Sequence, residues 1–171
     1  MEEKIIIAGF GGQGILFLGK LISQSGILAG LNTTYIPSYG AEVRGGTAHC
    51  HVVLSDSEIA SPVIEKPDTL IMMNEPSFVK FEKIINSGGL IISNSSLISA
   101  KQKRNDVTEK FISATNIAEG LGNAKVANIV MLGFYSRLKN IISKDIILKN
   151  ITGPLVELNR KAFNAGYEYE Q

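Results

Sequence analysis

Cysteine and tryptophan are almost absent from this chain, whose 171 residues include one cysteine, Cys50, and no tryptophan. A single cysteine cannot form a disulfide within the chain, and it cannot hold an iron–sulfur cluster or a structural zinc ion alone. Aromatic residues make up 7% of the sequence and do not alternate with basic residues as in single-strand nucleic-acid binders. These shortages exclude a disulfide-stapled fold and a cluster held by this chain's own cysteines.

Neither sign of charge is in excess. The 17 Lys and Arg residues nearly balance the 16 Asp and Glu residues, so the chain has no basic field for nucleic acid. No apolar run approaches the roughly 18 residues of a membrane span, and residues 1–4 lack the basic start of a signal peptide. We therefore expect a cytoplasmic protein without nucleic-acid or membrane partners, folded as a single domain over residues 1–171.

Glycine, in contrast, is present in a defined pattern near the start of the chain. Apolar residues 5–8 lead into Gly9, Gly11 and Gly14, and residues 12–29 have helical periodicity. This G-x-G-x-x-G spacing between a strand and a helix is that of a dinucleotide-binding turn, and the N–H groups at such a helix start favour an anion. The alternative is a purely structural turn.

An NAD site also needs an acidic residue about 20 residues further on, at the end of the second strand. The β-rich residues 32–36 are instead followed by Pro37, Ser38 and Tyr39, without a carboxylate. A stand-alone NAD dehydrogenase is therefore disfavoured, and the glycine turn holds the phosphates of another ligand or none.

A second glycine-punctuated stretch follows the second strand. Glu42 and Arg44 lie among glycines at positions 40, 45 and 46. Long loops of this kind are uncommon unless they bind something, since glycine allows backbone angles and close approaches that other residues do not. A structural loop with a solvated ion pair is the alternative.

Residues 47–54 alternate in the manner of a strand. Cys50 falls on its apolar side, where it is expected to be a small buried hydrophobe, and His49 and His51 fall together on the other side. Two histidines can ligate a metal only with a third ligand, and the sequence places no Asp, Glu or Cys to supply one. We therefore predict no metal site and assign the histidines to a packed or interface face.

The rest of the chain repeats strand–helix–strand. Residues 69–73 and 90–93 are continuous apolar runs, typical of buried parallel strands, and Pro76 opens the helix between them. Residues 58–60 are expected to return as a short strand after a turn at 56–57, forming a hairpin insertion. Further elements are expected as a strand over 107–114, a helix over 116–120 capped by Thr115, and helices over 125–138, at 143–147 and from 153. The prediction is an α/β, Rossmann-like domain with a mostly parallel sheet and helices on both faces.

No catalytic constellation is present in the sequence. It has no G-x-S-x-G elbow, no lysine in the position that a phosphate-binding P-loop requires, and no cysteine with a placed partner. We assign no catalytic residue, and the residues describe a glycine-loop domain that holds or covers something.

Two motifs resemble those of a known family. Residues 9–15, G-F-G-G-Q-G-I, look like the opening motif of the gamma subunit of 2-oxoacid:ferredoxin oxidoreductases, and residues 39–46, Y-G-A-E-V-R-G-G, look like its second signature. The spacing between them also agrees, and the resemblance covers essentially the whole chain. Residues 41–50 are most similar to 2-oxoglutarate and branched-chain 2-oxoacid enzymes, with pyruvate enzymes as a further alternative.

The resemblance implies a reaction in which a 2-oxoacid, coenzyme A and oxidised ferredoxin give an acyl-CoA, carbon dioxide and reduced ferredoxin. It also implies that thiamine diphosphate, magnesium and iron–sulfur clusters belong to partner subunits: alpha, beta and, where present, delta. This chain would then flank the active site without being catalytic alone, and ferredoxin would be reached through the complex. It would bind none of these cofactors by itself.

Two site hypotheses follow from the motifs. The first is that the glycine loop receives the diphosphate of coenzyme A through Gly9, Gly11, Gly12, Gln13 and Gly14. The second is that a subunit junction beside the active site is formed by Tyr39, Glu42, Arg44, Gly45 and Gly46. Competing interpretations are a stand-alone nucleotide-binding domain and a regulatory ligand-sensing module. An isolated chain can also form a homodimer through the surface meant for its partners.

Overall fold

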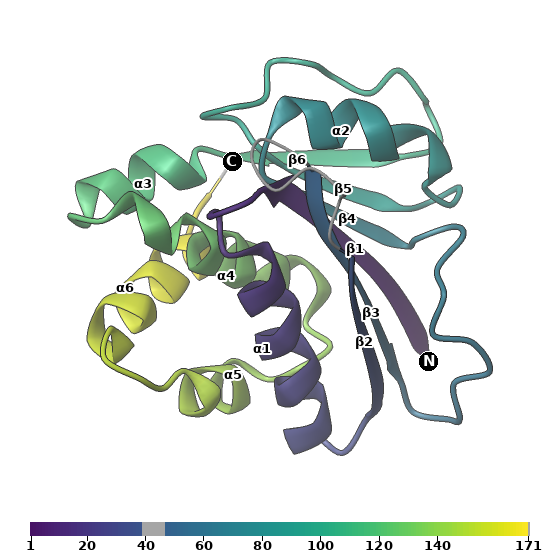
Figure 1. Cartoon of the computed structure of the whole chain (residues 1–171), viewed down its shortest axis with the longest axis horizontal. Helices are drawn as coiled ribbons and strands as arrows, with labels where there is room; N and C mark the ends of the chain where they lie inside the picture. The colour runs from purple at the N-terminus through teal and green to yellow at the C-terminus, as the bar shows by residue number, and fades with distance from the viewer. Residues whose placement is uncertain (39–46, 171) are drawn as a thin grey trace.

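The computed structural model describes residues 1–38 and 47–170 (Figure 1). Within these residues, one sheet is built from six strands in the order β2-β3-β1-β4-β5-β6. The strands are β1 (Glu2–Phe10), β2 (Asn32–Ser38), β3 (Thr47–Ser55), β4 (Thr69–Met72), β5 (Leu90–Asn94) and β6 (Thr108–Ile112). The helices are α1 (Ile15–Leu28), α2 (Glu75–Phe81), α3 (Ala114–Gly120), α4 (Ala127–Lys139), α5 (Lys144–Asn150) and α6 (Val156–Tyr167), with short 3-10 turns η1 (Glu82–Ile84) and η2 (Ala124–Val126).

The sheet is mostly parallel, as the recurring strand–helix–strand pattern predicts. β1, β4, β5 and β6 pair in parallel, whereas β3 runs against both of its neighbours, β1 and β2. The chain therefore winds one way from β1 through α1 to β2, and the other way from β4 to β6. The point where the winding reverses lies between β1 and β4.

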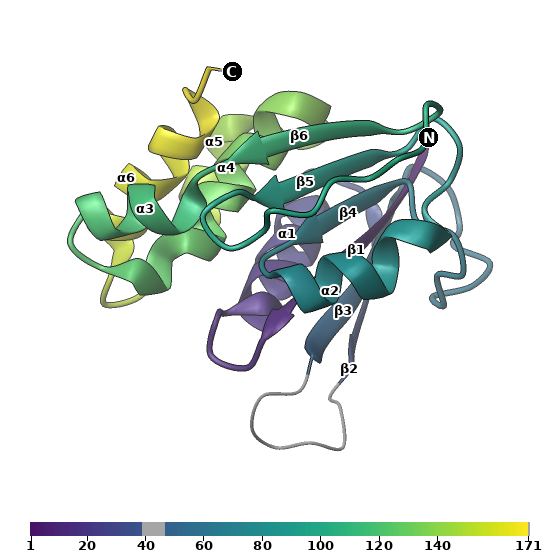
Figure 2. The same cartoon turned by 90° about the horizontal axis from the view of Figure 1, so that it is seen from above.

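Helices cover both faces of the sheet, as predicted (Figures 1 and 2). Alternate residues of β1 feed two cores: Ile5 and Ile7 pack with α1 and α4, while Ile6 and Ala8 pack with α2 residues such as Phe78. This arrangement follows from the strand's period of two, because both faces of a central strand are buried. No helix in the described ranges is both long and apolar enough to cross a membrane.

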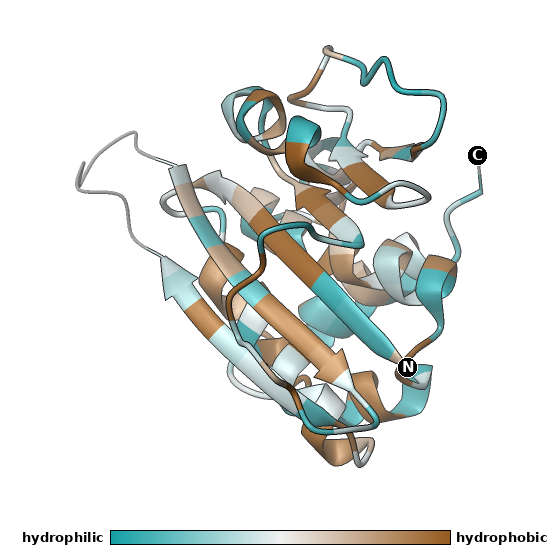
Figure 3. Cartoon of the chain, turned by 90° about the vertical axis from the view of Figure 1, so that its right-hand side faces the viewer, coloured by the Kyte–Doolittle hydropathy of each residue, from teal (hydrophilic) through white to brown (hydrophobic). Residues whose placement is uncertain are grey.

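The expected hairpin return at residues 58–60 is wrong, since these residues form no strand. Both edges of β3 are already occupied, by β1 on one side and β2 on the other, so no edge is left for a returning strand. The antiparallel hairpin is formed by β2 and β3 instead. The chain after β3 crosses the outer face of the sheet as an irregular connector of mixed hydropathy (Figure 3).

The C-terminal helices form a layer held by a close crossing. A Cβ atom added to Gly133 of α4 would collide with the carbonyl oxygen of Phe163, and one added to Gly166 of α6 would collide with that of Val130. The two helix backbones therefore approach each other through their glycines. This contact holds α4 against α6. The α3, η2 and α4 segment of the same layer lies beside the glycine loop.

The starts of α1 and α3 differ from the prediction, those of α4 and α6 fall two and three residues later than expected, and the cap of α5 agrees with it. α1 begins at Ile15 rather than at position 12, because Gly14 is in the left-handed conformation with a φ of 71°. Thr115 does not cap α3, which begins after Ser113; its hydroxyl instead accepts a hydrogen bond from Asn94. Ser143 caps α5 as predicted.

Candidate functional site

The glycine loop lies at the carboxyl end of β1, at the point where the winding of the sheet reverses. Crevices of this kind are where open α/β sheets bind ligands. The Gln13 side chain holds the loop closed, because its Oε1 accepts from the Phe10 N–H at 2.7 Å and its Nε2 donates to the Met73 carbonyl at 3.4 Å. The loop is thereby tied to the ends of both β1 and β4, so Gln13 acts here as a brace of the loop.

The glycines of the loop have different structural requirements. Gly12 and Gly14 have positive φ angles of 96° and 71°, which other residues rarely adopt. Gly9 is crowded, since an added Cβ would lie 2.5 Å from Gln13 Oε1 and 2.8 Å from Met73 Cβ. Gly11 has no such constraint among the described residues: its φ is not positive, and an added Cβ would meet none of their atoms within 4 Å.

The first turn of α1 has features that favour a negatively charged group. It contains no acidic residue, and no side chain among the described residues caps it. The carbonyl of Gly14 is held by Asn128 Nδ2 of α4 at 3.1 Å, which orients the turn. Exposed N–H groups at the positive end of a helix of this length attract negative charge.

A cavity of about 230 Å³ adjoins the loop at the carboxyl ends of the strands. It is bounded by the glycine loop, the end of β4 and the α3–α4 region, and its lining residues are Gly12, Gln13, Met73, Leu97, Thr115, Ala124, Lys125 and Ala127. A second cavity, of about 250 Å³, opens beside Phe17 on α1 and shares Lys125 with the first. Two hollows therefore lie near the start of α1, one of them lined by Gly12 and Gln13 of the loop.

Buried asparagines shape the base of this region, and sequence reasoning missed them. Asn94 is fully buried at the end of β5 and donates to Thr115 Oγ1 at 2.9 Å and to the Met73 carbonyl at 3.4 Å. Asn74, at the end of β4, caps α2 by accepting from the Ser77 N–H. A polar residue directly after each buried apolar run was the available signal, because the carboxyl ends of parallel strands meet at one edge.

The strand beside β1 explains why an NAD carboxylate is missing. In the NAD-binding arrangement the second strand lies next to the first and carries the acidic residue. Here β3 occupies that position, with Thr47 paired to Phe10 at the glycine-loop edge. No acidic side chain of β3 stands at this edge, so the geometry agrees with the sequence in disfavouring NAD.

The second motif lies outside the described residues, and its residues Tyr39, Glu42, Arg44, Gly45 and Gly46 remain predictions. The described residues that flank it are Ser38 and Thr47. Thr47 pairs with Phe10, and Ser38 pairs with His49 two residues along β3. The described residues on either side of the motif, Ser38 and Thr47, therefore lie at the sheet edge that carries the glycine loop.

His49 and His51 share one face of β3, as predicted, with ring centroids 5.6 Å apart. Burial lowers the pKa of both side chains, and Lys80 and His51 lower the pKa of His49 further. His51 Nδ1 accepts from the Ile64 N–H at 3.4 Å, which requires the neutral ring. The described residues contain no group of three or more metal-ligating side chains.

Cys50 is buried beneath α1, in agreement with its assignment as a small core residue. Its thiol donates to the Ile15 carbonyl at 3.6 Å. Burial raises the pKa of this thiol to about 12, so it is not a nucleophile at neutral pH.

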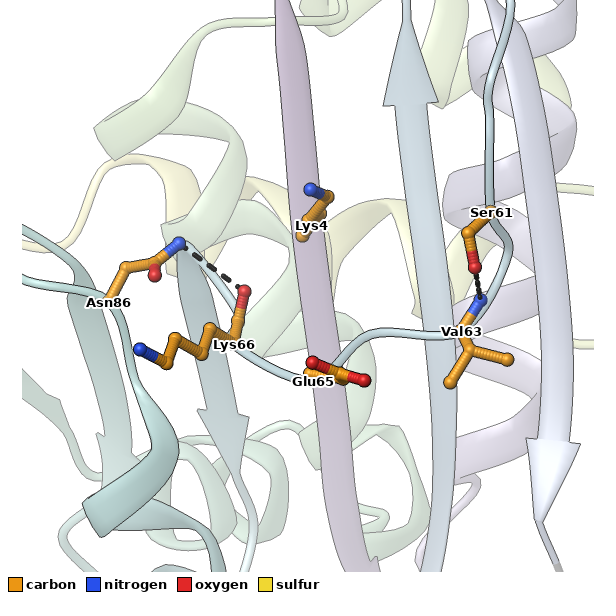
Figure 4. Close-up of a pocket in the computed structure, with 6 residues that line it drawn as sticks. All are labelled: Lys4, Ser61, Val63, Glu65, Lys66 and Asn86. Atoms are coloured by element: carbon orange, nitrogen blue, oxygen red, sulfur yellow. Dashed lines mark hydrogen bonds between the residues drawn. The ribbon is translucent and has the colours of Figure 1, made fainter.

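Another cavity, of about 380 Å³, lies away from the glycine loop (Figure 4). It is formed where the connector passes in front of the strands, and its lining residues are Lys4, Ser61, Val63, Glu65, Lys66 and Asn86. Lys4 is paired with Glu2 at 2.9 Å. Within the described ranges, no residue of the glycine motif lines this cavity, so the candidate site remains at the glycine-loop edge.

Comparison with known proteins identifies the family. A family model described as pyruvate ferredoxin/flavodoxin oxidoreductase matches residues 4–169. The chain belongs to this family. The KorC subunit of 2-oxoglutarate synthase from Methanocaldococcus jannaschii is 38% identical over 98% of this chain and 94% of its own length. Ketoisovalerate oxidoreductase subunit VorA from Methanothermobacter thermautotrophicus is 39% identical over 77% of this chain, but that match spans only 27% of VorA.

Solved structures agree with this membership. The gamma subunit of a keto/oxoacid ferredoxin oxidoreductase from Geobacter sulfurreducens superposes with a TM-score of 0.85 at 30% identity, covering 97% of this chain and 96% of that one. The resemblance to such gamma subunits is thus confirmed. A 2-oxoglutarate:ferredoxin oxidoreductase from Magnetococcus marinus, solved with 2-oxoglutarate, coenzyme A and succinyl-CoA bound, shares the fold with a TM-score of 0.88 at 22% identity over 97% of this chain and 30% of that one.

Proposed function

We propose that this chain is the coenzyme A-binding gamma subunit of a 2-oxoglutarate:ferredoxin oxidoreductase, acting as one unit over residues 1–171 in the cytoplasm. Full-length similarity to a 2-oxoglutarate synthase subunit supports this substrate. A branched-chain 2-oxoacid is the alternative, supported by the match to part of a ketoisovalerate enzyme subunit. The reaction is the conversion of the 2-oxoacid and coenzyme A to an acyl-CoA and carbon dioxide, with reduction of ferredoxin.

The coenzyme A assignment rests on three features that occur together where the winding of the sheet reverses. An uncapped, acid-free helix start faces a loop whose Gly11 opens onto free space, and a cavity adjoins the loop. A diphosphate fits such a helix start, as in dinucleotide sites, while the absence of the ribose carboxylate disfavours NAD. Coenzyme A supplies a diphosphate without requiring that carboxylate.

The remaining parts of the enzyme are assigned to partner subunits. Alpha and beta subunits, and a delta subunit where present, would hold thiamine diphosphate, magnesium and the iron–sulfur clusters. The proposed junction with them includes Glu42 and Arg44, which lie in the sequence between Ser38 and Thr47, two described residues at the glycine-loop edge. Bound there, coenzyme A would extend from this chain toward an active site completed by the partners.

Replacement of Gly11 by valine tests the coenzyme A site. The position suits this test, because an added Cβ meets no atom of the described residues within 4 Å and the φ of Gly11 is not positive. In the assembled enzyme, Gly11→Val is expected to raise the KM for coenzyme A by at least about tenfold without changing the KM for the 2-oxoacid. Steady-state ferredoxin reduction, measured anaerobically against each substrate, gives both constants.

Gly120→Val is the matched control. Gly120, the last residue of α3, is also unconstrained by φ or by neighbours, and it lines neither cavity beside the loop. The KM of the Gly120→Val enzyme for coenzyme A should equal that of the unsubstituted enzyme. An unchanged KM in Gly11→Val, with the complex intact, would show that the loop does not hold coenzyme A.

A further inference from the structure

Lys125 stands between the two cavities that flank the glycine loop. It lines the cavity of about 230 Å³ together with Gly12, and the cavity of about 250 Å³ together with Phe17. No other lysine or arginine of the described chain lines either one. Among the described residues, the one basic side chain placed at both hollows therefore lies beside the helix start proposed to receive an anion.

The backbone of Lys125 is held by a hydrogen bond, and its side chain is exposed to solvent. Its N–H donates to Asn123 Oδ1 at 3.0 Å, and the next residue, Val126, is buried. The Lys125 side chain itself is exposed, and no carboxylate in the described ranges lies within ion-pair distance of it. Three residues further on, Asn128 bonds the Gly14 carbonyl, so this segment is anchored to the glycine loop.

The two cavities differ in the chemistry of their walls. The first contains Met73 and Leu97 near the loop, and is suited to a flexible aliphatic chain. The second contains Phe17 and Leu155, both exposed, and offers a ring face to a planar base. Between them the charged groups are Lys125 and the N-terminal dipole of α1, which are suited to phosphate.

Coenzyme A has the same order of parts: a pantetheine arm, a diphosphate and an adenine nucleotide. We propose that Lys125 binds the diphosphate of coenzyme A, with the pantetheine arm in the Met73–Leu97 cavity and the adenine against Phe17. This assignment rests on the proposed function, because it names how the same site would hold its substrate. It adds Lys125 and Phe17 to a site that the glycine motif alone does not describe.

Lys125→Met in the assembled enzyme tests the charge. The KM for coenzyme A is expected to rise about tenfold, since a charge-assisted hydrogen bond to phosphate is lost. The KM for the 2-oxoacid should be unchanged, and Lys125→Arg should restore most of the affinity for coenzyme A. Lys20→Met is the matched control, because Lys20 is an exposed lysine of α1 that lines neither cavity.

Phe17→Ala tests the placement of the adenine. It should raise the KM for coenzyme A and leave the KM for phosphopantetheine, which lacks the adenosine part, unaffected. Equal effects on both acceptors would overturn this placement. Should Lys125→Met fail to assemble, calorimetric titration of coenzyme A into the isolated Lys125→Gln and Lys20→Gln chains makes the same comparison, with weaker binding expected only for the first.

The outcomes separate this inference from the proposed function. A raised KM for coenzyme A in Gly11→Val but not in Lys125→Met overturns the role of Lys125 and leaves the glycine-loop site standing. Unchanged values in both variants overturn the coenzyme A site altogether. A rise in the KM for the 2-oxoacid equal to that for coenzyme A in Lys125→Met would also contradict the inference, since it would indicate a general defect.

Discussion

At the scale of single residues, the glycine loop combines positions that serve the fold with one that does not. Gly12 and Gly14 are required by their positive φ angles, and Gly9 by the closeness of Gln13 and Met73. Gly11 has neither requirement in the chain alone. A small residue that the fold does not need is best explained by a ligand that approaches the backbone there, which is why the test of function is placed at this residue.

The two histidines of β3 make stability depend on pH. Burial lowers the pKa of His49 and His51 in the folded chain, so folding favours their neutral forms. Their contribution to stability is therefore fully present above the unfolded pKa of about 6.5 and is lost as the pH falls through the lowered folded values. Loss of the hydrogen bond from Ile64 to His51 adds to this effect.

We expect the free energy of unfolding to fall between about pH 7.5 and about pH 5.5, and the fall to be smaller in the double variant His49→Gln/His51→Gln. Urea unfolding at the two pH values measures the difference. The carboxylates are common to both proteins, so their titration cancels in the comparison. An identical fall in both would contradict the assignment.

At the scale of elements, the crossing of α4 and α6 depends on two glycines. A methyl group at position 133 would collide with the carbonyl oxygen of Phe163 on the facing helix. Gly133→Ala is expected to lower the free energy of unfolding by about 2 kcal/mol, because the helices must separate to make room. Gly120→Ala, where the added atom meets nothing, should change it by less than about 0.5 kcal/mol. Chemical denaturation of the two variants checks this, and equal stabilities would contradict a close crossing.

Periodicity was sufficient to predict most elements but not how the strands pair. The runs at β1, β4 and β5 have the composition of buried strands, and the helices between them follow from their apolar stripes. The expected strand at residues 58–60 failed because a local turn pattern says nothing about whether β3 has a free edge. Pairing is decided by distant strands, and only the assembled sheet shows it.

The site could be predicted from sequence in part. The glycine spacing indicated an anion-binding helix start. The structure shows an uncapped first turn there, and the binding of an anion stays a prediction. Asn94, Asn128 and Lys125 were missed, because each reaches the loop only through the packing of β5 and the α3–α4 region around it. The hydrogen bonds of Asn94 to Met73 and of Asn128 to Gly14 span 21 and 114 residues of chain, and no local pattern reveals contacts at such separations.

At the scale of the whole molecule, the described residues bring together a proposed binding site but no catalytic set. The chain's buried thiol is unreactive, with a pKa raised to about 12, and its histidines are neutral and packed on the sheet. Membership in the pyruvate ferredoxin/flavodoxin oxidoreductase family accounts for this lack of reactive side chains, because the family includes subunits of larger enzymes. The chain is a subunit of such an oxidoreductase, and we propose that it holds coenzyme A while the redox chemistry lies in its partners.

One measurement tests this account most directly: anaerobic purification of the tagged chain from its native cells, followed by assay of ferredoxin reduction with 2-oxoglutarate and coenzyme A. The account predicts that subunits carrying thiamine diphosphate and iron–sulfur clusters co-purify, and that reduction requires coenzyme A and is faster with 2-oxoglutarate than with branched-chain 2-oxoacids or pyruvate. Purification of the chain alone, with a nicotinamide dinucleotide bound, would contradict it.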